Sequence, residues 1–112
     1  PEAVVFPTLP RVYVAAFGTK GTDAGFPLLD ELRRAGVSAD MDFRSTSLKA
    51  HLRQADRLGA LYTILLGDDE IDKGIATLRN MQTKAQEDLP IRDLVSSLQS
   101  RLLTSISTPF SS

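Results

Sequence analysis

The chain has 112 residues, which suits one domain with a single core but is short for an enzyme with its own substrate and cofactor lobes. Its 13 basic and 14 acidic side chains leave a formal net charge of −1, so any contact with nucleic acid needs a local basic patch rather than an overall basic surface. The absence of cysteine excludes a disulfide framework, a thiolate metal site and a thiol nucleophile.

The sequence shows no sign of a membrane or of an export route. No apolar run approaches the roughly eighteen residues of a membrane helix, and the first residues lack the basic and apolar segments of a secretory signal. Because the lack of cysteine also fits a reducing compartment, we expect a cytoplasmic protein with no membrane partner.

The first strand and helix follow a proline-rich segment. Residues 1–10 carry three prolines and are interpreted as a linker from a preceding domain. The β-branched and aromatic residues 11–17 predict a buried strand, which the turn 18–21 ends. A helix is expected from residue 22 or 23 to about 35, with a proline tolerable only in its first turn.

A second strand and helix come next. Residues 39–43 predict a short strand, and residues 47–58 predict an amphipathic helix closed by a glycine. Lys49, Arg53 and Arg57 recur every four residues and form one exposed row on this helix. By itself such a row is most simply interpreted as a solvated face.

The third strand is the most apolar of the chain and leads into a cluster of acids. The nearly continuous apolar run 61–66 is typical of a strand covered on both faces. It is followed by Gly67 and then by the carboxylates Asp68, Asp69, Glu70 and Asp72.

The last part of the chain predicts a hairpin and a helix. Residues 74–81 predict a fourth strand, and residues 85–89 predict a short edge strand. The connections between the third, fourth and fifth strands are too short for a crossover helix, so these neighbouring strands should be antiparallel. Apolar residues at helical spacing predict a final helix over 90–103, and residues 104–112 form a Ser/Thr-rich, flexible tail.

The order of these elements predicts an α/β fold with three layers, α/β/α. Two right-handed crossovers give a five-stranded mixed sheet of order 2-1-3-4-5 with strand 4 antiparallel. This arrangement brings residues 18–21, 44–47 and 67–73 to one edge of the sheet, where open α/β sheets bind their ligands.

No catalytic residue emerges from the polar groups. The glycine turn 18–21 permits a phosphate cradle but matches neither G-x-G-x-x-G nor the P-loop, so turn glycines are the preferred interpretation. The acid cluster lacks EF-hand spacing and a nearby histidine, so no metal site is expected. His51, the only histidine, is interpreted as a surface or rim residue because the sequence offers it no partner acid or nucleophile. We therefore expect a domain that binds rather than catalyses.

An ordered series of motifs carries a family resemblance over roughly residues 10–103. The motifs are Arg44-Ser45-Thr46-Ser47-Leu48-Lys49, residues 52–60, Leu65-Leu66-Gly67-Asp68-Asp69-Glu70-Ile71, and residues 74–81 with Gln86 following. Together they resemble the C-terminal anticodon-binding domain of class II aminoacyl-tRNA synthetases, most specifically the histidyl-tRNA synthetases.

The resemblance implies that two residues read the anticodon. In related domains, the Glu of a Gly-x-x-Glu turn and a basic residue on the following strand contact anticodon bases, and those positions are Glu70 and Arg79 here. A carboxylate accepts from base amino groups, and a guanidinium donates to base acceptors or stacks on a splayed base. Arg79 lies about 17 Å along a strand from Gly74, so the pair should contact different nucleotides.

The resemblance also changes the interpretation of the basic row. Arg44, Lys49, Arg53 and Arg57 become candidate contacts to the RNA backbone, which position RNA without specifying its sequence. Arg57 is the weakest candidate because it lies farthest from the edge of the sheet.

The implied parent enzyme is a homodimeric histidine–tRNA ligase of the cytoplasm. Its partner RNA is the anticodon stem-loop of histidine tRNA, and ATP is used in a catalytic domain of the same chain that lies outside these residues, so no cofactor is expected here. Two other functions stay open: a synthetase-like regulatory or dimerisation domain that no longer reads tRNA, and a flavodoxin-like binder of a small ligand.

Overall fold

A computed structural model describes residues 11–42 and 47–107, with side chains up to residue 102. The elements are β1 (Val12–Ala16), α1 (Gly18–Arg34), β2 (Ala39–Asp40), α2 (Leu48–Leu58), β3 (Tyr62–Leu66), α3 (Asp68–Lys73), β4 (Ile75–Asn80), β5 (Gln86–Pro90) and α4 (Ile91–Ser107). None of the described helices is long and apolar enough to cross a bilayer.

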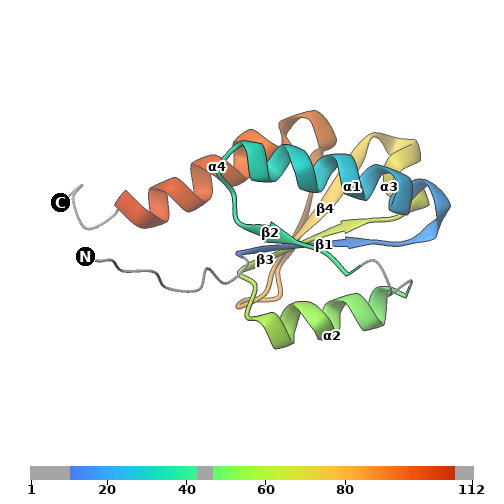
Figure 1. The fold of residues 1–112 in the computed structure, drawn as a ribbon, viewed down its shortest axis with the longest axis horizontal. Helices are drawn as coiled ribbons and strands as arrows, with labels where there is room; N and C mark the ends of the chain where they lie inside the picture. Colours follow the sequence, from blue (N-terminus) through green and yellow to red (C-terminus); the bar gives the residue numbers. More distant parts are fainter. Residues whose placement is uncertain (1–10, 43–46, 108–112) are drawn as a thin grey trace.

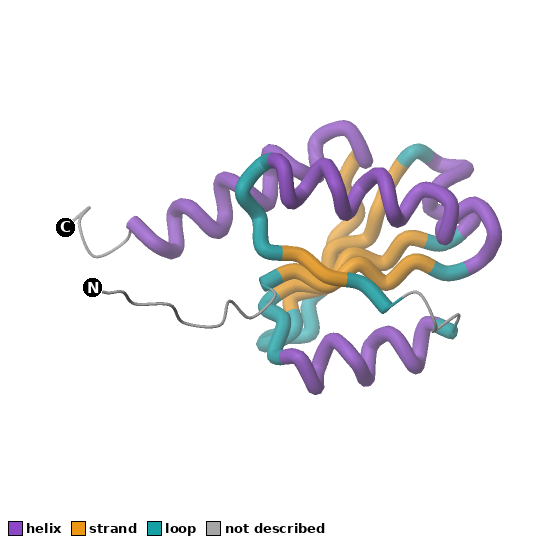
Figure 2. The backbone as a smooth tube through the Cα atoms, in the orientation of Figure 1, coloured by secondary structure: helices purple, strands orange, loops and turns teal. Residues whose placement is uncertain are grey.

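The sheet has the predicted topology. Its order is β2-β1-β3-β4-β5; β1 is parallel to β2 and β3, and β4 is antiparallel to both β3 and β5. Helices α1 and α4 lie on one face, α2 lies on the other, and α3 sits at the end of the sheet (Figures 1 and 2). The three-layer architecture and the strand order are thus confirmed.

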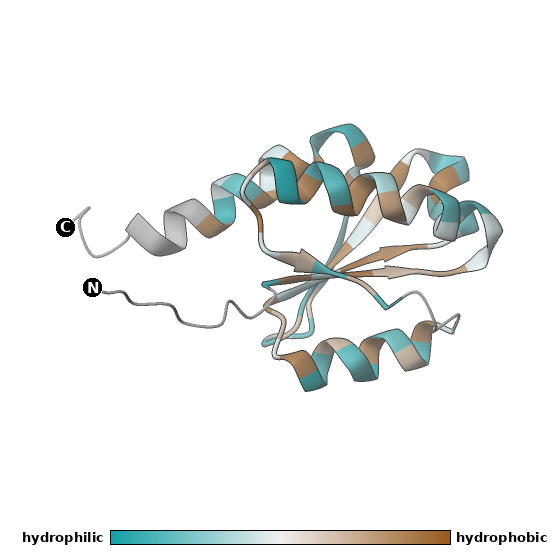
Figure 3. Ribbon diagram, viewed as in Figure 1, coloured by the Kyte–Doolittle hydropathy of each residue, from teal (hydrophilic) through white to brown (hydrophobic). Residues whose placement is uncertain are grey.

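Each face of the sheet has its own apolar core. The larger cluster joins α1 and α4 to alternate residues of the strands, among them Val14, Ile64 and Leu78, while the smaller one packs α2 on Tyr13, Ala15 and Leu65. The alternation follows from the two-residue period of a strand. Figure 3 shows the matching pattern on the helices, where hydrophobic and hydrophilic residues alternate.

The layer that contains α2 covers only part of the sheet. This helix packs against β1 and β3, whereas α4 packs against β4 and β5 on the other face. Ala76 and Leu78 point into the α4 side, so Thr77 and Arg79, which alternate with them, lie on the α2 side. Within the described residues, no helix packs over that face of β4 and β5.

The first helix begins earlier than predicted. The segment expected as a turn is the first turn of α1, which starts at Gly18, and Pro27 lies in the interior of the helix rather than in its first turn. Gly18 has φ of +77°, in the left-handed region that favours glycine. A Cβ at Gly21 would lie 2.2 Å from the Leu66 carbonyl oxygen. These glycines therefore permit close packing of the helix start against the end of β3.

The second strand is shorter than predicted, and the short helix α3 was not predicted. Among the described residues, strand β2 pairs only through Ala39 and Asp40, opposite Val12 and Tyr13, and the last residue of the predicted strand, Phe43, lies outside the described part. The acid cluster, which was placed at the edge of the sheet without an assigned helix, forms α3. At the end of the chain, α4 continues to Ser107 and so overlaps the predicted tail.

Candidate nucleic-acid interface

At the edge of the sheet that was predicted to bind ligands, α1 and α3 lie together. Their polar groups there bond to one another. The backbone N–H groups of Lys20 and Gly21 donate to Asp68 Oδ1, at 2.9 and 3.2 Å. Lys20 Nζ lies 2.6 Å from Asp72 Oδ1, and this bond raises the pKa of the lysine. The start of α1, where an anion would bind, is therefore occupied by a carboxylate of the chain itself.

Glu70 is held at the start of α3. Its Oε1 accepts a hydrogen bond from the Gly67 N–H at 2.8 Å, the reciprocal half of a capping box. The side chain is half-buried, and no ion pair engages it within the described residues. Because one carboxylate oxygen of Glu70 is bonded to the backbone, the position of its other carboxylate oxygen is also fixed.

Arg79 lies on the uncovered face of the sheet. It is opposite Thr63 on β3 and Gln86 on β5, and its side chain is half-buried. The Nε–H group is buried and has no hydrogen-bond partner among the described residues. A buried donor without a partner is costly, so a ligand that supplied an acceptor would be favoured here.

Glu70 and Arg79 do not converge. Glu70 is in α3, before β4 begins at Ile75, and Arg79 is the fifth residue of that extended strand, about 17 Å beyond Gly74. The intervening chain does not fold back, so the two residues cannot hold one base between them.

The basic row is exposed on α2. The helix starts at Ser47, whose Oγ accepts from the Ala50 N–H at 3.2 Å, and Lys49, Arg53 and Arg57 are all exposed. The four-residue spacing places the three cations on the side of α2 opposite its buried residues. No ion pair to these cations exists in the described part of the chain. The fourth candidate, Arg44, lies outside the described residues.

The prediction for His51 was wrong. The side chain is fully buried, and its Nδ1 lies 2.9 Å from the Tyr13 hydroxyl. That hydroxyl accepts from the Asp42 N–H at 3.2 Å, and burial raises the pKa of Tyr13 to about 12, so the protonated hydroxyl is free to donate to His51. His51 is three residues after Leu48 and four before Ala55, and this spacing was the available signal that it belongs to the apolar face of α2.

The described residues hold no group of three or more histidine, aspartate or glutamate side chains arranged to bind a metal. Of the acid cluster, Asp68 and Asp72 bond to α1 and Glu70 caps α3. Hydrogen bonding within the fold therefore accounts for three of the four acids.

Comparison with known proteins identifies the domain. Residues 11–101 match the family described as anticodon binding domain. A histidine–tRNA ligase of Acetivibrio thermocellus is 43% identical over 90 residues, which are 80% of this chain and 22% of that protein. The crystal structure of apo S. aureus histidyl-tRNA synthetase superposes with a TM-score of 0.72 at 32% identity, over 77% of this chain and 22% of that one.

A more distant structure shows the same fold. The RNA binding domain of threonyl-tRNA synthetase from Cryptosporidium parvum superposes with a TM-score of 0.73 at 22% identity, over 83% of this chain and 24% of that chain. The chain thus spans between a fifth and a quarter of the length of the relatives it matches. The family match covers most of the described residues, and the chain belongs to the anticodon-binding domain family.

Proposed function

We propose that this domain binds the anticodon stem-loop of histidine tRNA as part of a longer histidine–tRNA ligase. The similarity to histidine–tRNA ligases supports the identity of the RNA. The observation that carries the binding mode is the buried, unpartnered Nε–H of Arg79 on the uncovered face of β4 and β5.

In the proposed binding mode, some residues contact the RNA bases and others contact the RNA backbone. Arg79 donates to, or stacks on, one unstacked anticodon base, and the free oxygen of Glu70 accepts from the amino group of another. The cations of α2, together with Arg44, contact phosphates and so position the loop. Because Glu70 and Arg79 are separated by most of a strand, they read different nucleotides.

The parent enzyme is part of the same proposal. It is a cytoplasmic homodimer whose catalytic domain, reached through residues 1–10, uses ATP to attach histidine to the tRNA. This domain then supplies recognition only, and it takes no cofactor of its own.

The test uses the 112-residue chain and fluorescently labelled stem-loops with the histidine anticodon or an unrelated one. We expect weak binding that prefers the histidine anticodon. Glu70→Gln and Arg79→Gln should each reduce this preference, by about 5- to 160-fold for the loss of one base contact worth about 1–3 kcal/mol. The matched control is Arg92→Gln on α4, which is exposed and on the other face of the sheet.

Two results would contradict the proposal. If the chain binds no RNA, the synthetase-like regulatory or dimerisation function is favoured. If a nucleotide or flavin raises the melting temperature while RNA does not, the domain is a small-ligand binder. Melting temperatures of all variants separate lost recognition from lost folding.

A further inference from the structure

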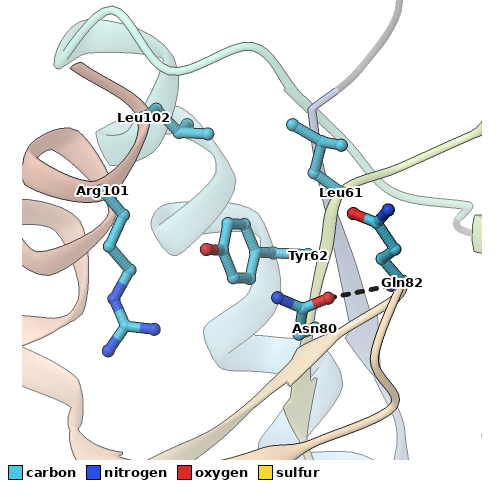
Figure 4. Close-up of a pocket in the computed structure, with 6 residues that line it drawn as sticks. All are labelled: Leu61, Tyr62, Asn80, Gln82, Arg101 and Leu102. Atoms are coloured by element: carbon cyan, nitrogen blue, oxygen red, sulfur yellow. Dashed lines mark hydrogen bonds between the residues drawn. The ribbon is translucent and has the colours of Figure 1, made fainter. Parts of the chain in front are cut away.

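A pocket of about 170 Å³ opens at the end of the sheet away from α3 (Figure 4). It lies where β3 begins and β4 ends, beneath the second half of α4. Its lining residues are Leu61, Tyr62, Asn80, Gln82, Arg101 and Leu102. None of them belongs to the proposed RNA interface.

The polar side of the pocket is built from fixed hydrogen-bond donors. Asn80 Oδ1 accepts from the N–H groups of Gln82 and Thr83, at 2.9 and 3.0 Å, which leaves the amide nitrogen of Asn80 to the pocket. Figure 4 shows this nitrogen turned toward the Arg101 side. Arg101 is itself held by Glu87, at 2.9 Å, with its guanidinium carbon 6.0 Å from the centre of the Tyr62 ring. The pocket therefore suits a ligand that offers hydrogen-bond acceptors.

The other side of the pocket is apolar. Leu102 is almost buried, whereas Leu61 is 39% exposed and is one of two large apolar side chains among the described residues that stand exposed, the other being Phe26. An apolar wall beside a set of donors fits a peptide segment that combines an apolar side chain with a carbonyl or carboxylate oxygen.

The position of the pocket indicates which segment this is. The N–H groups of Leu61 and Tyr62 both donate to the Arg11 carbonyl oxygen, at 2.9 and 3.1 Å, so Arg11, the first described residue, lies directly beside the pocket. The relatives are between four and five times as long as the part that this chain matches, which is 22% of the A. thermocellus protein. In such a parent, chain that precedes these residues would join the domain at this end of the sheet.

We propose that the pocket docks a loop from the part of the parent chain that precedes residue 1. The loop places an apolar side chain against Leu61 and an acceptor oxygen toward Asn80 and Arg101. This inference rests on the proposed function, because it requires the chain to be one domain of a longer ligase. The pocket opens on the α4 side of the sheet, whereas Arg79 lies on the opposite side, so docking here leaves Arg79 accessible to RNA.

Hydrogen–deuterium exchange of the full-length parent tests this docking. Backbone amides of residues 80–85 should exchange about tenfold more slowly in the parent than in the 112-residue chain, because the docked loop covers the pocket. Leu61→Asp in the parent should return exchange to the rate of the chain. Phe26→Asp makes the same chemical change at the other exposed apolar residue, far along α1, and should leave the slow exchange unchanged.

The inference is overturned if residues 80–85 exchange equally fast in parent and chain, or if Phe26→Asp releases the protection and Leu61→Asp does not. Stem-loop binding by the Leu61→Asp chain separates the two proposals. Retained binding with no protection in the parent refutes the docking alone, whereas protection without any RNA binding refutes the proposed function alone.

Discussion

At the scale of single residues, Tyr13 is a fully buried side chain whose hydroxyl makes two hydrogen-bond contacts. Its hydroxyl lies between the Asp42 N–H and His51 Nδ1, and thereby ties the start of α2 to β1 and to the chain that leaves β2. Because α2 carries the basic row, this buried pair helps to set where the row stands. The spacing of His51 places it on the apolar face of α2, but its pairing with Tyr13 was not recognisable in sequence, since β1 and α2 are brought together only by the fold.

The hydroxyl of Tyr13 should make stability fall at alkaline pH. Burial raises the pKa of Tyr13 from 10.0 to about 12, so the unfolded chain loses this proton first and the free energy of unfolding drops as pH rises from about 10 to 12. The full loss is about 2–3 kcal/mol, while below pH 10 the contribution is complete. Urea unfolding followed by circular dichroism at pH 7, 9 and 11 measures it.

Two variants isolate this effect. Tyr13→Phe should cost about 1–2 kcal/mol at pH 7, because the buried His51 and the half-buried Asp42 N–H each lose a partner, and should show a shallower loss at pH 11 than the unsubstituted chain. Tyr62→Phe removes the other tyrosine and should keep the steep loss. An equal alkaline slope in all three proteins would refute the role given to Tyr13.

At the scale of elements, the sequence predicts most of the fold because hydrophobic periodicity is strong where a strand or helix is long. The run Tyr62–Leu66 and the stripe of α4 were recognisable for that reason, and the short connections predicted the antiparallel hairpin. Helix α3 was not predicted, because six residues dominated by acids show no apolar period. The start of α1 was predicted at the wrong residue, because a glycine needed for close packing is indistinguishable in sequence from one needed for a turn.

The candidate site, too, could be predicted from the sequence only in part. The resemblance supplied Glu70 and Arg79, and strand geometry predicted that they lie apart. The capping bond of Glu70 depends on α3 beginning after Gly67, and this helix was not predicted. The unpartnered Nε–H of Arg79 depends on the packing of the sheet, which the sequence does not show.

The contact of α1 with the end of β3 predicts a sensitive glycine. Gly21→Ala should lower the free energy of unfolding by about 1–3 kcal/mol, because the new Cβ would lie 2.2 Å from the Leu66 carbonyl oxygen, a backbone atom that cannot rotate away. Thr22→Ala is the control, since Thr22 is the next residue of the helix and is exposed. Its effect should stay within about 0.5 kcal/mol in the same urea unfolding experiment. A Gly21→Ala chain as stable as the control would show that α1 and β3 are not packed this closely.

At the scale of the whole molecule, the small net charge hides a separation of charge. Helix α2 exposes three cations and one acid, whereas α3 carries four acids and a single lysine. Under the proposed function, RNA should therefore be attracted to α2 and repelled from α3, and the stem-loop should be oriented before any base is read. Because the net charge is only −1, we expect binding to unrelated nucleic acid to be weak.

This separation predicts how binding should depend on salt. Plotted against the logarithm of salt concentration, the logarithm of the binding constant should fall linearly, and each lost phosphate contact should reduce the slope by about 0.7–0.9. Lys49→Ala and Arg53→Ala should each show this reduction and weaken cognate and unrelated stem-loops alike, because phosphate contacts carry no sequence information. Arg92→Ala on α4 serves as the matched control and should leave the slope unchanged. If the α2 variants keep the original slope, or lose only the preference for the histidine anticodon, the row is a solvated face or a base-reading element and the assignment to phosphates is wrong.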